Sequence, residues 1–523
     1  MSDYTDRLTD LYFEDLPNNR EVGEAKRKVR LALSEEGKAL SFEQIVARYP
    51  SLDSLGTLGG FLPERIAEWR KRSGRRDIVF SLIRLIVFFF FSLVFWLFVL
   101  FGTNFLWDEL TFPSSPFWWA VGGYGVVCGV FGLRMGKRRF KHGSMAKKCV
   151  AVFLVLLLLY GCYALMTANL WYPQPYINSV PSVAHVLSPI EYDEANGVFS
   201  ITSKGDLFKI LHLTDIHLGG SVFSRTADVK ALKACYAEIE YTKPDLVIVT
   251  GDLSSPMGVM SLSLNNYTPI HQFAAFMRNV GIPWAFTYGN HDTERFASVK
   301  SDAVELEFMS LSYKTSGTLL YPYVQPEITG RNNQVIEIKN ADGSLNTALF
   351  LLDSNSYTGE GLNAYDYIHD DQVEWYASEI GRLEKREGRR ISSLAFFHIP
   401  LTEYRTAYDL YLAGSDEVTY HFGKIGETAG GRISCSAHAS RLFDKMEELG
   451  STKGAFCGHD HYNNISLTYR GIRLTYGMSI DYLVMPGISR MNEQRGAELI
   501  TLRSDSSWDL EQIPLMSISQ QKA

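Results

Sequence analysis

The pattern of apolar and polar positions divides the 523-residue chain into three parts and a connecting segment. Residues 1–76 are polar, carry charges of both signs and show short stretches of helical spacing. Residues 77–171 are rich in apolar residues, and residues 78–106 consist mainly of Phe, Leu, Val and Ile. After residues 172–206, a Pro-containing segment that we interpret as a linker, apolar runs of strand length alternate with helical periodicity. The pattern therefore predicts a small helical N-terminal region, an apolar region and an α/β domain at residues 207–523.

The apolar region contains three stretches that resemble transmembrane helices: residues 78–106, 117–133 and 150–171. A helix needs about 20 predominantly apolar residues to cross a bilayer. The first and third stretches have that length, whereas the second is shorter and rich in glycine. We therefore expect a membrane domain with three crossings at residues 77–171, and a lipid bilayer as a partner of the chain.

Basic residues set the orientation that we expect for these helices. Clusters of Lys and Arg precede the first stretch and separate the second from the third, whereas the loop after the first contains neither. Because basic loops remain on the cytoplasmic side, the N-terminus is expected in the cytoplasm and the α/β domain on the extracytoplasmic side. If residues 117–133 enter the bilayer without crossing it, the α/β domain returns to the cytoplasm.

The last part of the chain is predicted to be an α/β fold. Strands are expected at residues 207–214, 245–250, 283–288, 334–339, 347–354, 394–397 and 454–457. Helices are expected at residues 228–241, 270–280, 298–312, 371–387 and 436–449, and further strands at 465–476, 497–503 and 508–513. Alternation followed by a β-rich tail indicates two sheets packed face to face with helices outside.

Five apolar runs of this domain end abruptly in polar residues. The side chains at these ends are Asp215, His217, Asp252, Asn290, His398, His459 and His461. Open α/β folds bind their ligands at the carboxyl ends of strands, and buried charges without partners are costly. A bound cation accounts for all five ends, so the sequence predicts a metal site.

The types of side chain favour two metal ions and chemistry at phosphorus. Asp252 follows a strand and is placed to bridge two ions, while imidazoles and oxygens complete a mixed set that suits Mn, Fe or Zn better than Ca. Two ions about 3.5–4 Å apart are the arrangement for displacement at a phosphate. His291 is not needed as a ligand and can protonate a leaving alkoxide, with Asp292 fixing its orientation.

The ordered set Asp-x-His, Gly-Asp, Gly-Asn-His-Asp, a lone His and Gly-His-x-His resembles the calcineurin-like metallophosphoesterase superfamily over about residues 207–480. The resemblance implies a four-layer αββα sandwich, two divalent or trivalent metal ions and a phosphate-ester substrate. The ligands that it implies for the first metal are Asp215, His217, Asp252 and His461. Those for the second are Asp252, Asn290, His398 and His459. His291 is implied as the catalytic histidine.

One position departs from a known branch of that superfamily. Purple acid phosphatases have a Tyr ligand of ferric iron three residues after the bridging Asp, and Ser255 occupies that position here. A tyrosinate-coloured iron site is therefore not expected. The remaining layout, with Asp353-Ser354-Asn355 and His398-Ile399-Pro400-Leu401, is similar to non-purple relatives of the branch.

Composition changes this picture little. The net charge of -7 gives no reason to expect a nucleic-acid partner. The six cysteines show no CxxC spacing, which indicates buried thiols and not a zinc knuckle or a disulfide framework. No motif identifies a protein partner.

Our leading interpretation is a membrane-anchored phosphoesterase, and two alternatives stay open. The first is a diesterase or pyrophosphatase that acts on lipid-linked phosphates, because a membrane anchor would hold the site beside lipid headgroups. The second is a non-catalytic receptor or scaffold with a vestigial enzyme fold. Loss of a metal ligand would favour that alternative, and none of the seven ligands is missing from the sequence.

Overall fold

The computed structural model describes residues 158–521 with internal gaps, and six single positions nearer the N-terminus. The gaps are residues 164–165, 169, 185–187, 257–260, 295–296, 359–363, 427–432 and 486–494, and the six positions are Asp10, Gly23, Lys26, Arg27, Arg30 and Ala47. The chain divides into two compact units, Met1–Gly143 and Ser144–Ala523. The fold below is that of the second unit, and the predicted helical region at residues 1–76 stays a prediction.

The prediction of a membrane domain with three transmembrane helices is not supported and is corrected here. Within the part of the chain that the structure describes, no helix combines the length and the apolar character that a bilayer crossing requires. The predicted spans at residues 78–106 and 117–133, and most of that at 150–171, lie outside the described residues. The predicted multi-pass topology, with a cytoplasmic N-terminus and an extracytoplasmic α/β domain, is withdrawn, because it depends on spanning helices and the described residues contain none.

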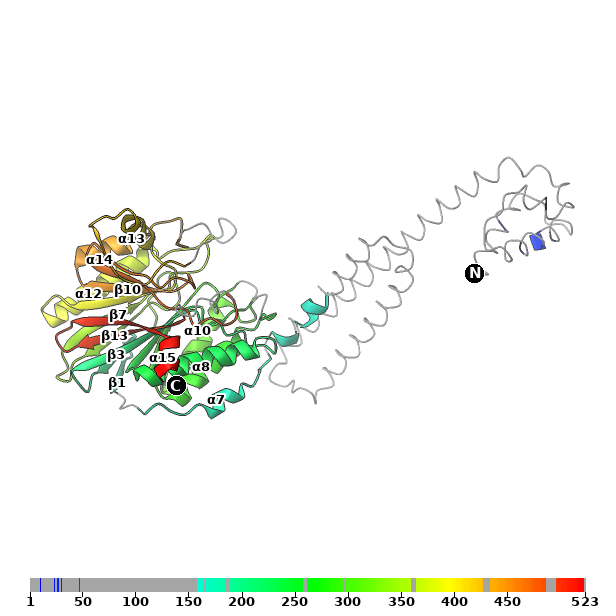
Figure 1. Cartoon of the computed structure of the whole chain (residues 1–523). Helices are drawn as coiled ribbons and strands as arrows, with labels where there is room; N and C mark the ends of the chain where they lie inside the picture. The colour runs from blue at the N-terminus through cyan, green and yellow to red at the C-terminus, as the bar shows by residue number, and fades with distance from the viewer. Residues whose placement is uncertain are drawn as a thin grey trace. The chain divides into compact units, whose positions relative to one another are not determined.

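Two β-sheets form the centre of the α/β domain (Figure 1). The larger has nine strands in the order β1-β2-β6-β7-β8-β10-β12-β11-β9, and the smaller has five in the order β14-β13-β3-β4-β5. The strands of the larger sheet are β1 (Ile190–Asp193), β2 (Val198–Thr202), β6 (Gln334–Lys339), β7 (Leu345–Leu351), β8 (Ser392–Phe396), β9 (Val418–Phe422), β10 (Thr452–Cys457), β11 (Ser466–Tyr469) and β12 (Ile472–Tyr476). Those of the smaller are β3 (Leu207–Leu213), β4 (Leu246–Thr250), β5 (Trp284–Thr287), β13 (Gly496–Arg503) and β14 (Trp508–Pro514).

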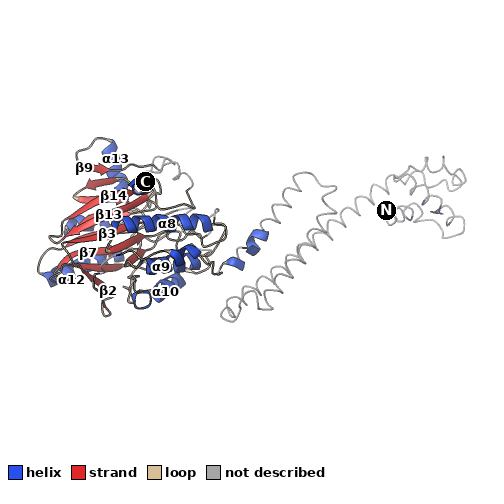
Figure 2. Ribbon diagram, turned by 60° about the horizontal axis from the view of Figure 1, so that its bottom comes forward, coloured by secondary structure: helices blue, strands red, loops and turns tan. Residues whose placement is uncertain are grey.

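Helices cover the outer face of each sheet (Figure 2). The helices are α7 (Pro175–Ser179), α8 (Arg225–Thr242), α9 (Tyr267–Val280), α10 (Ser301–Ser310), α11 (Tyr313–Ser316), α12 (Asp370–Glu387), α13 (Thr402–Leu412), α14 (Leu442–Leu449) and α15 (Leu515–Gln521). Apolar side chains of α8, α9 and α10 pack on the five-stranded sheet, and those of α12, α13 and α14 pack on the nine-stranded sheet. The two sheets with their two helical layers form an αββα sandwich, so the α/β part of the predicted fold is confirmed.

Strand β3 shows how an almost continuous apolar run serves two cores. Successive side chains of a strand point to opposite faces. Leu211 and Leu213 therefore pack against the helical layer, whereas Phe208 and Ile210 pack between the sheets. Burial on both faces explains why the strand carries little polar sequence before its last residues.

Two segments contain more regular structure than their sequences indicated. Residues 172–206, interpreted as a linker, contain α7, β1 and β2, and β2 pairs in parallel with β6. Residues 402–432, in which no element was expected, contain α13 and the edge strand β9. Both β1 and β9 are short edge strands with exposed or half-exposed positions, so their apolar pattern is weak.

Parallel connections bring the polar strand ends to one edge of the sandwich. In the smaller sheet β3, β4 and β5 run parallel to one another. In the larger sheet β7, β8 and β10 are also parallel. The carboxyl ends of neighbouring parallel strands meet at the same edge, and the next residues of the chain carry the predicted ligands.

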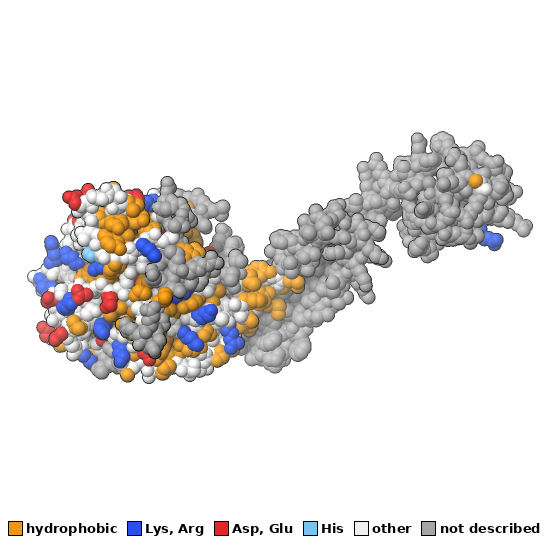
Figure 3. Space-filling model, in the orientation of Figure 1, with side chains coloured by type: hydrophobic (Ala, Val, Ile, Leu, Met, Phe, Trp, Pro, Cys, Tyr) orange, Lys and Arg blue, Asp and Glu red, His pale blue; other side chains and the backbone are white. Residues whose placement is uncertain are grey.

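Charged side chains of both signs are interspersed on the visible face of the α/β domain (Figure 3). Several acidic and basic residues of the domain form ion pairs, for example Arg470 with Glu447 and Lys314 with Glu194. The expectation that the chain has no nucleic-acid partner stays a prediction, since a single face does not test it.

Candidate metal centre

The chain takes an unusual backbone conformation at four of the predicted ligands. Asp215, His217, Asp252 and His459 have φ angles of 51°, 50°, 50° and 78°. Residues other than glycine seldom adopt positive φ, and such strain concentrates at functional sites. Here the left-handed residues turn the chain directly after β3, β4 and β10. The turns bring the side chains of the candidate ligands together at the edge of the sheets.

The first group of candidate ligands contains Asp215, His217, Asp252 and His461, all of them buried. One ligand atom of each lies within 4.8 Å of those of the other three. The Nε2 atoms of His217 and His461 are 3.1 Å apart, and His461 Nε2 is 3.4 Å from Asp215 Oδ1. These four residues come from three separate strand ends, and they are the set that the family resemblance implied for the first metal.

The second group contains Asp252, His398 and His459, with Asn290 beside them. His398 Nε2 lies 3.2 Å from Asp252 Oδ2 and 3.2 Å from Asn290 Oδ1. His459 is edge-on to His398, with ring centroids 5.2 Å apart. Asp252 belongs to both groups, so its position is that of a ligand shared by two neighbouring sites.

The donor atoms of these groups fit a pair of metal ions. Donors bound about 2.1 Å from a common ion lie roughly 3.0–3.5 Å from one another, and the separations above fall in or near this range. Among the described residues Asp252 Oδ2 is buried and has no hydrogen-bond partner. His217 and His461 also direct two ring nitrogens at each other, an arrangement that needs a proton or a cation between them. A metal pair satisfies both conditions.

Without an ion, the acidic and basic side chains of the centre stabilise one another's charges. Burial lowers the pKa of His398, but the carboxylate of Asp252 outweighs it and raises this pKa to about 9. Burial also lowers the pKa of His461, but the carboxylates of Asp215 and Asp481 outweigh this effect and raise the pKa to about 10. Both imidazoles must lose a proton before they bind a metal, so metal binding to them releases protons.

Groups behind the ligands fix which ring nitrogen faces the centre. His398 Nδ1 donates to the carbonyl oxygen of Thr250 at 2.8 Å, and His461 Nδ1 contacts Asp481 Oδ2 at 3.1 Å. In both rings Nε2 is left for a metal, as in carboxylate–histidine–metal arrangements. Asp481 was not identified from the sequence, because it lies 20 residues after His461 and belongs to no motif. It is fixed in turn by the backbone N–H groups of Leu483, Val484 and Met485.

The structure places His291 beside the metal ligands, but it gives Asp292 different contacts from those expected. The His291 ring is 5.4 Å from that of His217. Asp292 is buried and accepts hydrogen bonds from the backbone N–H groups of Gly289 and Ser254. The carboxylate that contacts the His291 ring is Glu294, whose Oε1 is 3.0 Å from Nδ1. The sequence analysis missed Glu294, and its position three residues after His291 is the signal that could have found it.

The pKa of His291 is raised above its ordinary value. Burial lowers it, and the negative charges of Asp252 and Glu294 outweigh that effect. A raised pKa favours the protonated imidazole, which is the form that can donate a proton to a leaving group.

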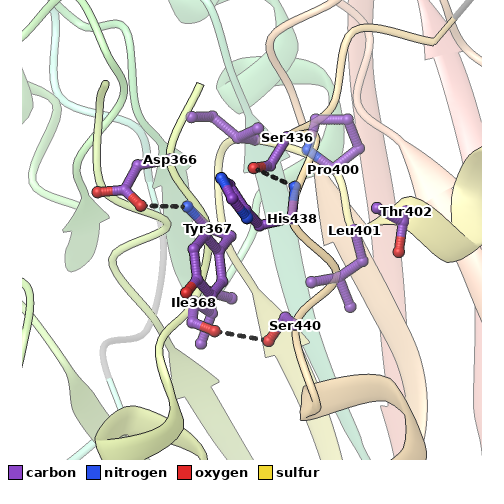
Figure 4. Close-up of a pocket in the computed structure, with 10 residues that line it drawn as sticks. Asp366, Tyr367, Ile368, Pro400, Leu401, Thr402, Ser436, His438 and Ser440 are labelled. Carbon is purple, nitrogen blue, oxygen red and sulfur yellow. Dashed lines mark hydrogen bonds between the residues drawn. The ribbon is translucent and has the colours of Figure 1, made fainter. Parts of the chain in front are cut away.

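A packed wall formed by three chain segments lies beside the second ligand group. The cavity of Figure 4 is lined by Asp366, Tyr367, Ile368, Ile399, Pro400, Leu401, Thr402, Ser436, His438 and Ser440. Its volume of about 10 Å³ has room for no more than about one water. Ser436 Oγ donates to the carbonyl oxygen of Tyr365, whose ring is edge-on to His459 with centroids 4.4 Å apart. The wall therefore supports the ligands and is too tightly packed to hold a substrate.

Gly289 allows two loops of the centre to approach each other. A Cβ added to Gly289 would lie 2.2 Å from Asp252 Oδ1 and 2.3 Å from the backbone nitrogen of Asp252. Gly289→Ala is therefore expected to displace Asp252 and to lower bound metal to less than one ion per chain, as measured by plasma mass spectrometry. Gly381→Ala, in α12, is the matched control: nothing lies within 4 Å of its added Cβ, and it should bind as much metal as the unmodified protein. Equal metal content in both variants would contradict the packing argument.

Comparisons with known proteins show what this chain is similar to. Residues 208–463 match the family model described as Calcineurin-like phosphoesterase. Two relatives are from Arabidopsis thaliana. "Probable inactive purple acid phosphatase 28" is 29% identical over 56% of this chain and 74% of its own length. "Probable inactive purple acid phosphatase 14" is 30% identical over 53% and 71%.

A third relative, "Phosphatase DCR2" of Saccharomyces cerevisiae, is 28% identical over 52% of this chain and 47% of its own length. Among solved structures, a dimetal phosphatase from Danio rerio aligns with a TM-score of 0.35 and 10% identity, over 59% of this chain and 99% of that one.

Proposed function

We propose, because the chain belongs to the calcineurin-like phosphoesterase family, that it hydrolyses phosphate esters at a centre of two metal ions. The observation that carries the proposal is the sharing of Asp252 by two groups of buried ligands. All seven ligands expected from the sequence lie in these groups or, for Asn290, in contact with one of their members.

Each group of residues has a distinct part in the proposed reaction. Asp215, His217 and His461 would hold one ion, and Asn290, His398 and His459 the other, with Asp252 between them. When bound, the ions supply Lewis acidity, neutralise phosphate oxygens and lower the pKa of bound water. The left-handed turns and the contacts of Asp481 and Thr250 hold the ligands in place before a substrate arrives.

His291 is the proposed proton donor to the leaving oxygen. Its Nδ1 is occupied by Glu294, so Nε2 is the ring nitrogen available to a substrate. General acids of this kind contribute about 10²–10⁴-fold to the rate. Mn, Fe and Zn all suit the mixed nitrogen and oxygen donors, and the identity of the native pair is left to metal analysis.

The structure and the comparisons bear differently on the two alternatives, a lipid-linked substrate and a non-catalytic protein. The lipid-linked substrate was motivated by a membrane anchor, and that motivation is gone because the predicted spanning helices are not supported. The non-catalytic alternative is favoured by the names of the relatives from Arabidopsis thaliana, which describe them as probably inactive. It is opposed by the complete set of converging ligands in this chain.

Removal of metal tests the proposal directly. We expect chelation of the purified full chain to lower hydrolysis of 4-nitrophenyl phosphate by at least about 100-fold, because no side chain of the centre replaces the ions as a Lewis acid. Added Mn²⁺, Zn²⁺ or Fe²⁺ should restore it, with two ions bound per chain. Bis(4-nitrophenyl) phosphate assayed in parallel separates monoesterase from diesterase activity.

Two results would contradict the proposal. Activity that survives complete chelation would remove the role of the metals. Two bound ions without hydrolysis of either substrate would favour the non-catalytic alternative.

A further inference from the structure

One carboxylate outside the ligand set contacts two parts of the centre. Glu294 Oε1 lies 3.0 Å from His291 Nδ1 and accepts a hydrogen bond from the hydroxyl of Tyr357 at 3.4 Å. Glu294 and His291 are partly buried, with side-chain exposures of 18% and 32%. No motif identified in the sequence includes Glu294 or Tyr357.

Tyr357 in turn determines which way the Asn290 amide faces. Asn290 Nδ2 donates to the Tyr357 hydroxyl at 2.9 Å, and Asn290 Oδ1 faces His398 Nε2 at 3.2 Å. Only the oxygen of an amide binds a metal, because the NH₂ group has no available lone pair. The contact with Tyr357 therefore holds the amide with its oxygen toward the centre.

Tyr357 is itself held in place from the opposite side. It forms an isolated antiparallel bridge with Tyr365, and the two rings stack with centroids 5.9 Å apart. The ring of Tyr365 is edge-on to His459, another ligand of the same group. The hydroxyl of Tyr357 is thus a fixed point between Asn290 and Glu294.

We propose that Glu294 is a positioning residue that orients the His291 ring directly and the Asn290 amide through the hydroxyl of Tyr357. This inference rests on the proposed function. It adds the residues that orient the proton donor, His291, and one candidate metal ligand, Asn290. A purely structural ion pair is the alternative, but partly exposed pairs contribute little to stability.

The kinetic test compares Glu294→Ala with Glu294→Gln on two monoesters. An alkyl phosphate needs a proton on its leaving oxygen, whereas 4-nitrophenyl phosphate needs little help. We expect Glu294→Ala to lower kcat at least about tenfold on the alkyl phosphate, much less on 4-nitrophenyl phosphate, and to leave KM within about twofold. Glu294→Gln should recover most of the loss, because its amide oxygen can still accept from Nδ1. Equal losses on both substrates, or no recovery by Gln, would overturn the proposal.

The chain provides a matched control for this test. His271 Nε2 and Glu307 Oε2 form a similar pair at 2.9 Å, also partly exposed and outside both ligand groups. Glu307→Ala removes a comparable contact, and its kinetics should equal those of the unmodified protein on both substrates. A loss of activity in this control equal to that in Glu294→Ala would show that the effect is not specific to the centre.

A second measurement does not depend on activity. The reaction of individual histidines with diethyl pyrocarbonate is followed by peptide mass spectrometry. His291 should react at least about threefold faster in Glu294→Ala, because its Nδ1 is no longer held by a partner, and Glu307→Ala should change only His271. Tyr357→Phe should weaken binding of the second Mn²⁺ by about tenfold through the freed Asn290 amide.

The two proposals can fail separately. If the unmodified protein binds metal but hydrolyses nothing, the proposed function fails. The reactivity of His291 and the affinity for Mn²⁺ still test the positioning role of Glu294 in that case. Unchanged reactivity of His291 in Glu294→Ala, together with unchanged Mn²⁺ affinity in Tyr357→Phe, would overturn that role even in an active enzyme.

Discussion

Asp252→Asn is expected to abolish the two-metal centre. Asn has nearly the same size as Asp. It also tolerates the left-handed backbone conformation that Asp252 adopts. Its Oδ1 can still accept from the backbone N–H of His291, as it does now at 2.9 Å. The lost group is the Oδ2 that lies near both His217 and His398. We expect no more than one ion per chain and a fall in kcat/KM of at least about 10³-fold, or about 4 kcal/mol.

Metal content and thermal unfolding of the same preparation distinguish this outcome from misfolding. Asp353→Asn is the control, since Asp353 is also buried and accepts backbone hydrogen bonds, from Arg331 and Asn355, but belongs to neither ligand group. It should bind two ions. If Asp252→Asn also kept two ions, Asp252 would not be the shared ligand and the arrangement proposed for the centre would be wrong.

His291→Gln should lower kcat on an alkyl phosphate by about 10²–10⁴-fold, the usual contribution of a general acid. The loss on 4-nitrophenyl phosphate should be much smaller, and two ions should stay bound, because His291 is not in either ligand group. In the unmodified protein, activity on the alkyl ester should fall as pH rises through the raised pKa of His291, since only the protonated imidazole donates. That decline should be absent from the profile of the variant.

His271→Gln is the matched control for this experiment. His271 is a partly exposed histidine that also contacts a glutamate, and it lies on α9, outside both ligand groups. It should leave both activities and the pH profile unchanged. An equal loss on both substrates in His291→Gln, or loss of an ion, would assign His291 a role in metal binding and not in proton transfer.

Much of this protein could be predicted from local sequence. Alternating apolar runs and helical periodicity gave the α/β alternation, and Gln334–Lys339 and Asp370–Glu387 match the predicted elements to within one residue. Strand ends that stop at Asp, Asn or His pointed to the candidate ligands, because buried polar groups at a sheet edge require partners. The structure brings together all seven of those residues.

The errors arose where local pattern did not determine the outcome. Apolar composition at residues 77–171 suggested spanning helices, and the described residues contain no helix that could cross a bilayer. Residues 190–202 were taken for a linker, because the edge strand β1 is short and half-exposed and has little pattern of its own. Asp292 was assigned to His291 because it is adjacent in sequence, whereas its side chain is buried against Gly289 and Ser254.

The sequence by itself indicated which side chains form the candidate centre. Each of them follows an apolar run that predicts a strand. Only the tertiary structure decided which other side chains support them. Asp481 reaches His461 from 20 residues away, and Tyr357 reaches Asn290 from 67. Contacts at such separations depend on how two sheets stack and how loops cross their edge, and no periodicity along the chain records that arrangement.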